Sequence, residues 1–173
     1  MKTIKTIFFL LAVATTVISC DAVNDLVPDV EITEDFEAKV NAVIDAGSTS
    51  LDATLNVDAS TNADFQKYKD NIKSVSIEGF TYALSNVDAP EGTILNGTLS
   101  ASGKSITITD LAIANGTTRA VTAAESEFFN ALAADLKADG KATIALSGTV
   151  NNDEGSTFTI TVTPTIQFIF EVL

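Results

Sequence analysis

The fold is decided by the stretch TFTITVTPTIQFIFEV, residues 157–172. Every even position in it is apolar or proline, and every odd position from 157 to 165 is threonine. A period of two places one face of a β-strand in the core and the other toward solvent. At about 3.3 Å per residue the run would be about 50 Å long, which is longer than most strands. We therefore expect it to bend or to change sheets at Pro164, which cannot donate to a ladder.

The same alternation recurs upstream. It predicts a strand from Phe36 to Ile44 and a hairpin partner from Leu51 to Val57, with a turn at Gly47-Ser48 between them. Further strands are predicted around 75–84, 94–99, 106–113 and the segment before Asn151. The parity of the apolar residues switches across Glu78-Gly79, which is typical of a β-bulge. Together with the final run, this makes about seven strands.

Four polar segments separate or interrupt these strands. Residues 88–92 and 102–104 predict turns, whereas Asn96-Gly97 leaves two interpretations open, one continuous strand or a tight hairpin that splits it. Asn115-Gly116 is expected to end a strand, since a polar, threonine-rich loop follows it.

One amphipathic helix is predicted over about 122–138, before the last two strands. Thr122 and Glu125 form a T-x-x-E capping box, and Gly140 is expected to stop the helix. Its apolar stripe could bind a partner, but packing on the sheet is the default for such a face. The stripe comprises Ala124, Phe128, Phe129, Leu132, Ala133 and Leu136. The pattern as a whole predicts a mainly β chain folded as an antiparallel β-sandwich.

The order of these elements resembles the WHy/LEA-2-type β-sandwiches, which place a helix ahead of the closing strands. The stretch from Phe128 to Phe170, with Leu146-Ser147-Gly148 after the helix, carries the likeness. The Asn-Pro-Asn element common in that family is missing, and Asn86-Val87-Asp88 is at best its remnant. The resemblance therefore implies architecture and no activity.

The N-terminus has the pattern of an export signal. Lys2 and Lys5 precede an apolar run over 7–18, which is too short for a membrane-spanning helix of about 20 residues. The tetrapeptide Val17-Ile18-Ser19-Cys20 resembles the lipobox of bacterial lipoprotein precursors. That resemblance implies a signal peptide over 1–19 and a Cys20 acylated with fatty acids such as palmitate. The protein would then be anchored to a membrane of the cell envelope. The inner and the outer membrane are both compatible with the sequence, and we favour the outer one.

Residues 20–35 are acidic and predict a solvated tether that leads to a single domain over 36–173. The alternative is an edge strand formed by Leu26, Val27, Val30 and Ile32. The formal charge of −13 would become −15 once Lys2 and Lys5 are removed with the signal. Such a charge repels phosphates, and we expect no nucleic-acid binding.

The composition excludes most catalytic chemistry. The chain has no histidine, and its one cysteine is assigned to lipidation, so His- and Cys-based catalysis and His-based metal sites are ruled out. We expect no enzyme activity and no cofactor. A weak calcium hypothesis rests on Asp58, Asn62 and Asp64 in one loop and Asp153 in another, although such residues are also ordinary in turns.

Two functions remain. The first is a non-catalytic envelope protein that contacts an unidentified envelope partner as an accessory, scaffold or adhesin-like subunit. The alternative is a carrier of an apolar small molecule or lipid, in a pocket between the sheets or under the helix. The weak ligand candidates are Phe128, Phe129, Leu132, Phe168 and Phe170, which a solid core would explain equally.

Overall fold

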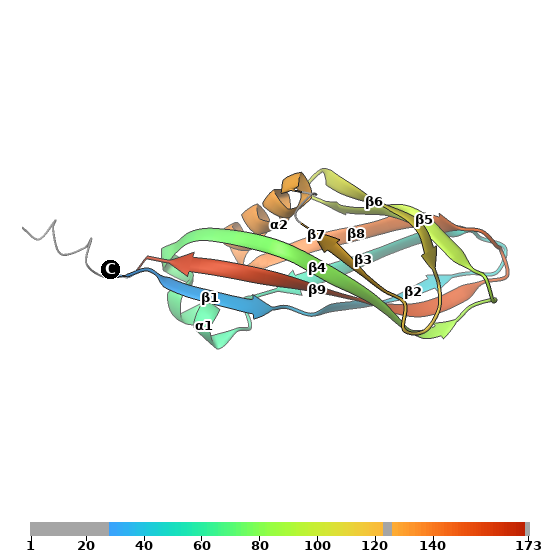
Figure 1. Cartoon of the computed structure of the whole chain (residues 1–173), viewed down its shortest axis with the longest axis horizontal. Coiled ribbons are helices and arrows are strands. Elements are labelled where there is room, and N and C mark those ends of the chain that lie inside the picture. Colours follow the sequence, from blue (N-terminus) through green and yellow to red (C-terminus); the bar gives the residue numbers. More distant parts are fainter. Residues whose placement is uncertain (1–27, 123–125, 172–173) are drawn as a thin grey trace, which may run out of the picture.

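The computed structural model describes residues 28–122 and 126–171, which form two antiparallel sheets packed face to face (Figure 1). In the first sheet, β1 and β2 lie along one side of β9, and β4 and β7 follow on the other side. The second sheet has the order β3-β8-β5-β6. The strands are β1 (Val30–Asp35), β2 (Ala38–Ile44), β3 (Ser50–Asp58), β4 (Ile72–Asp88), β5 (Ile94–Ala101), β6 (Lys104–Ala112), β7 (Thr118–Thr122), β8 (Lys141–Val150) and β9 (Ser156–Phe170). The predicted antiparallel β-sandwich is confirmed.

β9 is the central strand of the first sheet and stays in that sheet over its whole length. Of the two outcomes predicted at Pro164, a bend or a change of sheets, the change of sheets does not occur. Pro164 lies where the neighbour of β9 changes from β1 to β2, and its carbonyl accepts a hydrogen bond from the Phe36 N–H at 3.0 Å. The N and O of a strand residue point to the same side, so the missing N–H faces this short gap in the ladder. A proline is tolerated here inside a central strand for that reason.

The predicted hairpin between residues 36–44 and 51–57 is also wrong. β2 pairs with β9, whereas β3 pairs with β8 of the other sheet, so the turn at Gly47 carries the chain across the sandwich. Both strands bury one face toward the shared core, and alternation alone does not distinguish a paired neighbour from a facing one.

Two of the nine strands in the described residues were not among the seven expected. β1 occupies the second half of the predicted tether, so the tether is wrong for Val30–Asp35 and the edge-strand alternative holds for Val30 and Ile32. β7 occupies the expected threonine-rich loop and pairs with β4 from Gly79 to Ala83. Both are short edge strands that bury little, which leaves a weak apolar pattern in the sequence.

Two glycine-containing sites shape the ladders. The predicted bulge is present, with a register shift of β4 between Ile77 and Gly79. Asn96-Gly97 is no turn, because β5 runs through it with a register shift between Leu95 and Gly97. Gly97 instead lies directly opposite Gly148 of β8, where the two backbones approach so closely that a Cβ on Gly97 would lie 2.3 Å from the Ser147 carbonyl oxygen.

Two helices complete the fold. α1 (Ala63–Tyr68) begins at Asn62, whose side chain accepts a hydrogen bond from the Phe65 N–H, and a 3-10 turn (Lys69–Asn71) follows it. α2 (Ser126–Asp139) ends at Gly140, whose φ of 69° confirms the predicted stop. Thr122 is the last residue of β7, while Ala124 and Glu125 lie outside the described residues, so the capping box stays a prediction.

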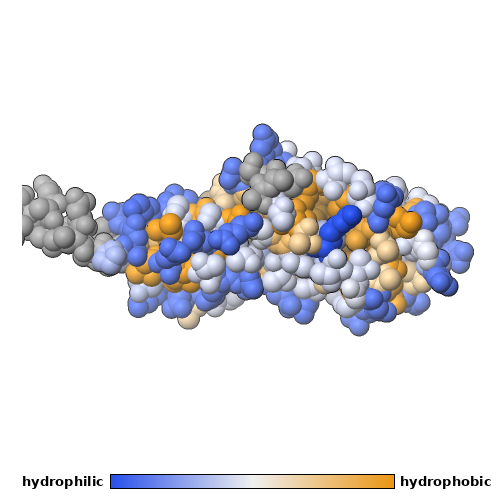
Figure 2. All heavy atoms as spheres, in the orientation of Figure 1, coloured by the Kyte–Doolittle hydropathy of each residue, from blue (hydrophilic) through white to orange (hydrophobic). Residues whose placement is uncertain are grey.

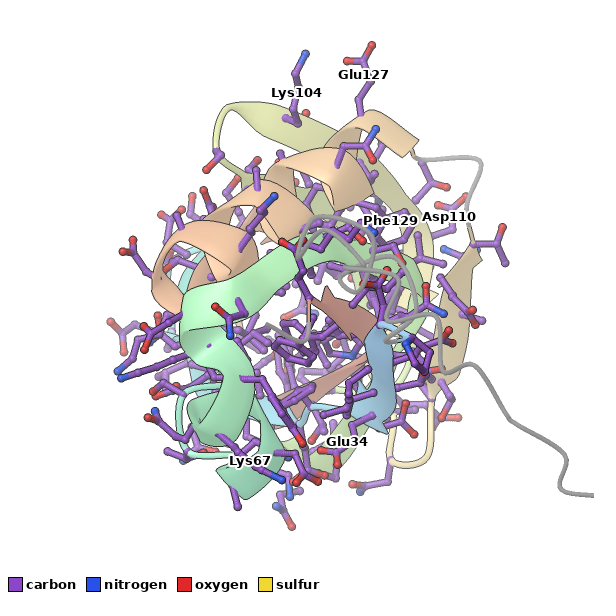
Figure 3. The ribbon with its side chains drawn as sticks, turned by 90° about the vertical axis from the view of Figure 1, so that its left-hand side faces the viewer. Glu34, Lys67, Lys104, Asp110, Glu127 and Phe129 are labelled. Atoms are coloured by element: carbon purple, nitrogen blue, oxygen red, sulfur yellow. The ribbon has the colours of Figure 1, made fainter. Side chains whose placement is uncertain are left out.

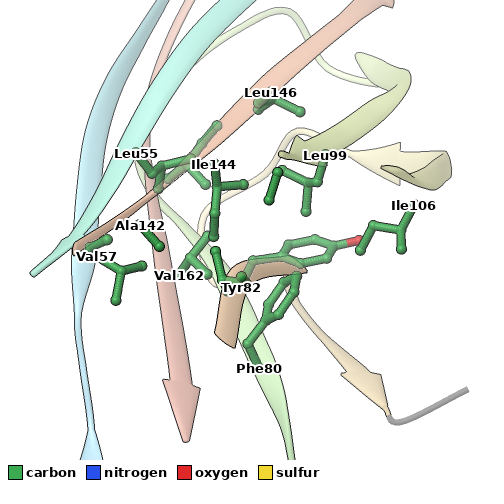
Figure 4. Packing of buried hydrophobic residues seen from close by; sticks show 14 of the residues in the cluster. Leu55, Val57, Phe80, Tyr82, Leu99, Ile106, Ala142, Ile144, Leu146 and Val162 are labelled. Carbon is green, nitrogen blue, oxygen red and sulfur yellow. The ribbon is translucent and has the colours of Figure 1, made fainter. Parts of the chain in front are cut away.

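α2 packs mainly against β4 and β8 and covers one opening of the sandwich (Figure 1). Its stripe is buried in the core at Phe128, Phe129, Leu132, Ala133 and Leu136, which leaves no apolar stripe facing solvent at these five positions. Between the sheets, side chains from β3, β4, β5, β8 and β9 interdigitate (Figure 4). The helix stripe therefore packs on the sheets, as the default interpretation predicted.

Candidate functional site

The two ends of the sandwich are built differently. Val30 of β1 and Ile72 of β4 both pair with Phe170, so the first described strand, the end of β9 and the neighbouring helix α1 share one end. At the other end, β2, β4 and β8 finish and β3, β5 and β9 begin, which brings together the loops 45–49, 88–93 and 151–155 (Figure 1). We call these three loops the distal tip.

Hydrogen bonds tie the loops of the distal tip to one another. The Asn151 side chain accepts from the Ile94 N–H at 2.9 Å and donates to the Gly92 carbonyl at 3.0 Å. The Asn152 amide donates to the Thr93 hydroxyl at 2.7 Å, and the Gly47 N–H donates to the Asp153 carbonyl at 2.7 Å. The asparagines therefore position one loop against the other two, and the tip is a single connected surface.

The distal tip is acidic without compensation. Its three loops contain five exposed carboxylates and no lysine or arginine, and no ion pair joins them to any base of the described residues. The carboxylates belong to Asp45, Asp88, Glu91, Asp153 and Glu154. The corresponding end of the molecule, at the right in Figure 2, is mostly hydrophilic. Charged groups without partners at one end attract an oppositely charged partner.

A hollow of about 560 Å³ lies beside these carboxylates, lined among others by Asp45, Asp88, Glu154 and Val43. Val43 is 59% exposed and is the only large hydrophobic side chain of the described residues that is exposed. Ser156 also lines the hollow, and its buried hydroxyl has no hydrogen-bond partner within the described residues. The surface thus combines acidic groups with one apolar contact, which suits a partner with basic and apolar side chains.

The calcium candidates do not converge. Asp58 lies next to the start of β8, opposite Lys141, whereas Asp153 follows the end of β8 at the distal tip. Asp58 accepts a hydrogen bond from the Ser60 N–H at 2.8 Å and pairs with Lys141 at 3.1 Å. A further hydrogen bond from the Ser60 hydroxyl is the main cause that lowers the pKa of Asp58 below its usual value.

The other calcium candidates serve local structure. Asn62 caps α1 at 2.8 Å from the Phe65 N–H and also donates to Glu34, while Asp64 lies in the first turn of that helix. No group of three or more acidic, histidine or cysteine side chains suited to a metal occurs within residues 28–122 and 126–171. These side chains therefore have the turn and cap roles that the sequence left open as the alternative.

The five ligand candidates are buried in two aromatic clusters. Phe128 and Phe129 contact each other at 5.8 Å between ring centroids and both contact Phe80 beneath α2. Phe168 and Phe170 stack at 5.9 Å near α1, where Phe36, Phe65 and Tyr68 pack against them. Leu132 is fully buried, and none of the five lines any of five prominent surface hollows of the described residues. The five side chains pack as part of the core.

The remaining predicted site, Cys20, lies outside the described residues, as do the signal peptide over 1–19 and residues 20–27 of the predicted tether. In the described part of the chain, neither helix is long and apolar enough to cross a membrane.

Sequence reasoning identified the tip segments only as turns. Their convergence depends on which strands share a sheet, and the hairpin error hid it. The usable signal was the absence of any lysine or arginine from all three loops.

By its fold the protein is an antiparallel β-sandwich. No family model and no curated protein matches the chain. Among solved structures it is similar to the decameric BFDV capsid protein, with 8% identity, a TM-score of 0.46 and coverage of 80% of this chain and 99% of that one. It is also similar to Desmodium yellow mottle tymovirus, with 10% identity, a TM-score of 0.39 and coverage of 85% and 91%.

Proposed function

We propose that the protein is a non-catalytic, lipid-anchored protein of a bacterial cell envelope that acts through protein contacts made by its distal tip. The observation that carries this proposal is the position of the acidic, apolar-edged tip at the end opposite β1, the described strand nearest in sequence to Cys20. An anchor at one end leaves the other end free for a partner.

The dimensions support this arrangement. Nine residues separate Cys20 from Val30. β9 has 15 residues, so the domain adds about 50 Å beyond that point. The tip would therefore reach several nanometres from the membrane surface, far enough to contact a second envelope protein.

Replacing Cys20 by serine is expected to block acylation and to leave the precursor uncleaved, since the thiol that accepts the acyl chains is lost. Cells labelled with a clickable palmitate analogue should show a labelled, detergent-phase product for the wild type and none for Cys20→Ser. Ser19→Ala, which keeps a small residue before the cysteine, serves as the matched control. An acylated Cys20→Ser product would contradict the assignment.

A photo-crosslinking amino acid placed at Glu91 is expected to trap an envelope protein in living cells. Reversing two carboxylates of the hollow, with Asp88→Lys and Glu154→Lys, should lower the yield of this adduct about tenfold, because the attraction for a basic partner turns into repulsion. The control is Asp70→Lys, which makes the same charge change in the 3-10 turn after α1, at the opposite end of the sandwich. An adduct reduced equally by Asp70→Lys would show a general charge effect and would argue against the tip.

A further inference from the structure

The sandwich has an open side where its two sheets end. β6 is the last strand of the second sheet and β7 the last strand of the first, and no backbone hydrogen bond joins them within the described residues. A hollow of about 290 Å³ runs between them, lined by 106–109 of β6, 119–122 of β7 and Tyr82 of β4. We call it the β6–β7 groove. Its two walls are strand edges.

Both edges present unpaired backbone groups to the groove. The Leu84 N–H donates to the Thr117 carbonyl at 2.8 Å, which sets the hydrogen-bonding pattern between β4 and β7. Alternate residues of β7 therefore direct their backbone N–H and C=O groups toward β4, and the others, including Ala120 and Thr122, direct theirs away from it. In β6, the two-residue turn after Ala101 directs the backbone N–H and C=O groups of Lys104, Ile106 and Ile108 toward β5. Thr107 and Thr109 therefore direct their N–H and C=O groups outward.

Either edge could accept one more strand. An extended segment that lies about 4.8 Å from an edge, in the hydrogen-bonding direction, would pair with the unpaired groups of that edge. An exposed edge with unpaired donors and acceptors is a template for strand addition. The walls carry three threonines and Arg119 beside apolar residues such as Ile106 and Val121, and most of their exposed surface is polar, which favours a peptide over an apolar molecule.

Two polar side chains, Arg119 and Tyr82, line the groove. Arg119 is the only arginine of the chain and has no ion pair within the described residues; it spans the opening with one hydrogen bond to the Thr109 carbonyl at 2.9 Å. Its guanidinium has five donors, so most remain for a carboxylate. Tyr82 lies opposite Arg119 in the ladder and is only 3% exposed, and its hydroxyl points toward Ile106 (Figure 4).

We propose that the β6–β7 groove binds an extended segment of a partner protein as an added strand, with an aspartate or glutamate of that segment paired to Arg119. The inference rests on the proposed function, because both require contacts with another protein. It adds a second contact surface, which would bind an acidic side chain, whereas the distal tip would bind basic ones. Although the chain as a whole has a net charge of −13, the charged group at this groove is positive, so an acidic side chain is attracted there.

The test uses the full-length chain in detergent and random 12-residue peptides displayed on phage. Enriched peptides are expected to share an acidic residue within a β-forming stretch. For the best synthetic peptide, Arg119→Gln should weaken binding on the order of tenfold or more, since a charge-assisted hydrogen bond is lost, and Arg119→Lys should weaken it less. N-methylation of alternate peptide amides should abolish binding.

Lys104→Gln is the matched control, because Lys104 pairs with Glu127 on the exposed start of α2 and both project into solvent (Figure 3). Equal melting temperatures of the variants exclude misfolding. The proposal is overturned if no peptide is enriched, or if binding ignores both Arg119→Gln and N-methylation. Self-association that depends on Arg119 would assign the groove to a second copy, and displacement of the peptide by dodecanoate would assign it to an apolar acid. The Glu91 crosslink is independent, so a failure here leaves the tip proposal standing.

Discussion

Replacing Phe168 by alanine is expected to lower the free energy of unfolding by about 3–5 kcal/mol, the cost typical of deleting a buried ring. Phe168 is 1% exposed and contacts the rings of Phe36, Phe65 and Phe170 at 6.0, 5.2 and 5.9 Å between centroids. It thereby joins the segment after β1 and helix α1 to the central strand, and the cavity left by alanine would loosen all three.

Urea denaturation followed by circular dichroism would measure this loss. Val43→Ala is the control, because Val43 is 59% exposed and its truncation should change stability by less than about 0.5 kcal/mol. A loss below about 1 kcal/mol for Phe168→Ala would mean that the ring is not packed as described.

Gly97→Ala is expected to destabilise the protein by about 2–3 kcal/mol, although only one methyl group is added. The new Cβ would lie 2.3 Å from the Ser147 carbonyl oxygen and 2.8 Å from the Gly148 Cα, and both are backbone atoms of β8 that cannot move alone. β5 and β8 would have to separate at the middle of their ladder, which is the centre of the second sheet.

Thermal and urea denaturation of Gly97→Ala can be compared with Gly47→Ala. Gly47 has a φ of 86°, and a Cβ added there would meet no atom within 4 Å, so its substitution costs only the left-handed conformation, roughly 1 kcal/mol. Equal losses for the two variants would show that close approach of the strands does not matter at Gly97.

The sequence predicted the class of fold because β9 and α2 have strong, single periods. Burial alternates without interruption along positions 158–170 of β9, and the α2 stripe ends at a glycine that the backbone requires there. Strand pairing was less accessible, since the residues of β2 and β3 alternate in the same way whether they are neighbours or face each other across the core. β1 and β7 were missed because each has few buried side chains.

The candidate surfaces were predicted only in part. Asp153 was singled out in a loop of the distal tip, but its role there follows from its carbonyl and from charge, and no calcium arrangement surrounds it within the described residues. Arg119 was placed in a loop without a role, because its significance depends on two strand edges from different sheets. A property that arises between sheets leaves no periodic signal in either segment.

The pairing of β1 with β9 has a mechanical consequence. Force applied between the start of β1 and the distal tip acts along the axis of this strand, since β1 begins at one end of the sandwich and runs toward the other. The six residue pairs from Val30–Phe170 to Asp35–Thr165 are then loaded together in shear. They cannot open one after another as in a peeled hairpin, so a short edge strand can carry a tensile load that its small buried area would not suggest.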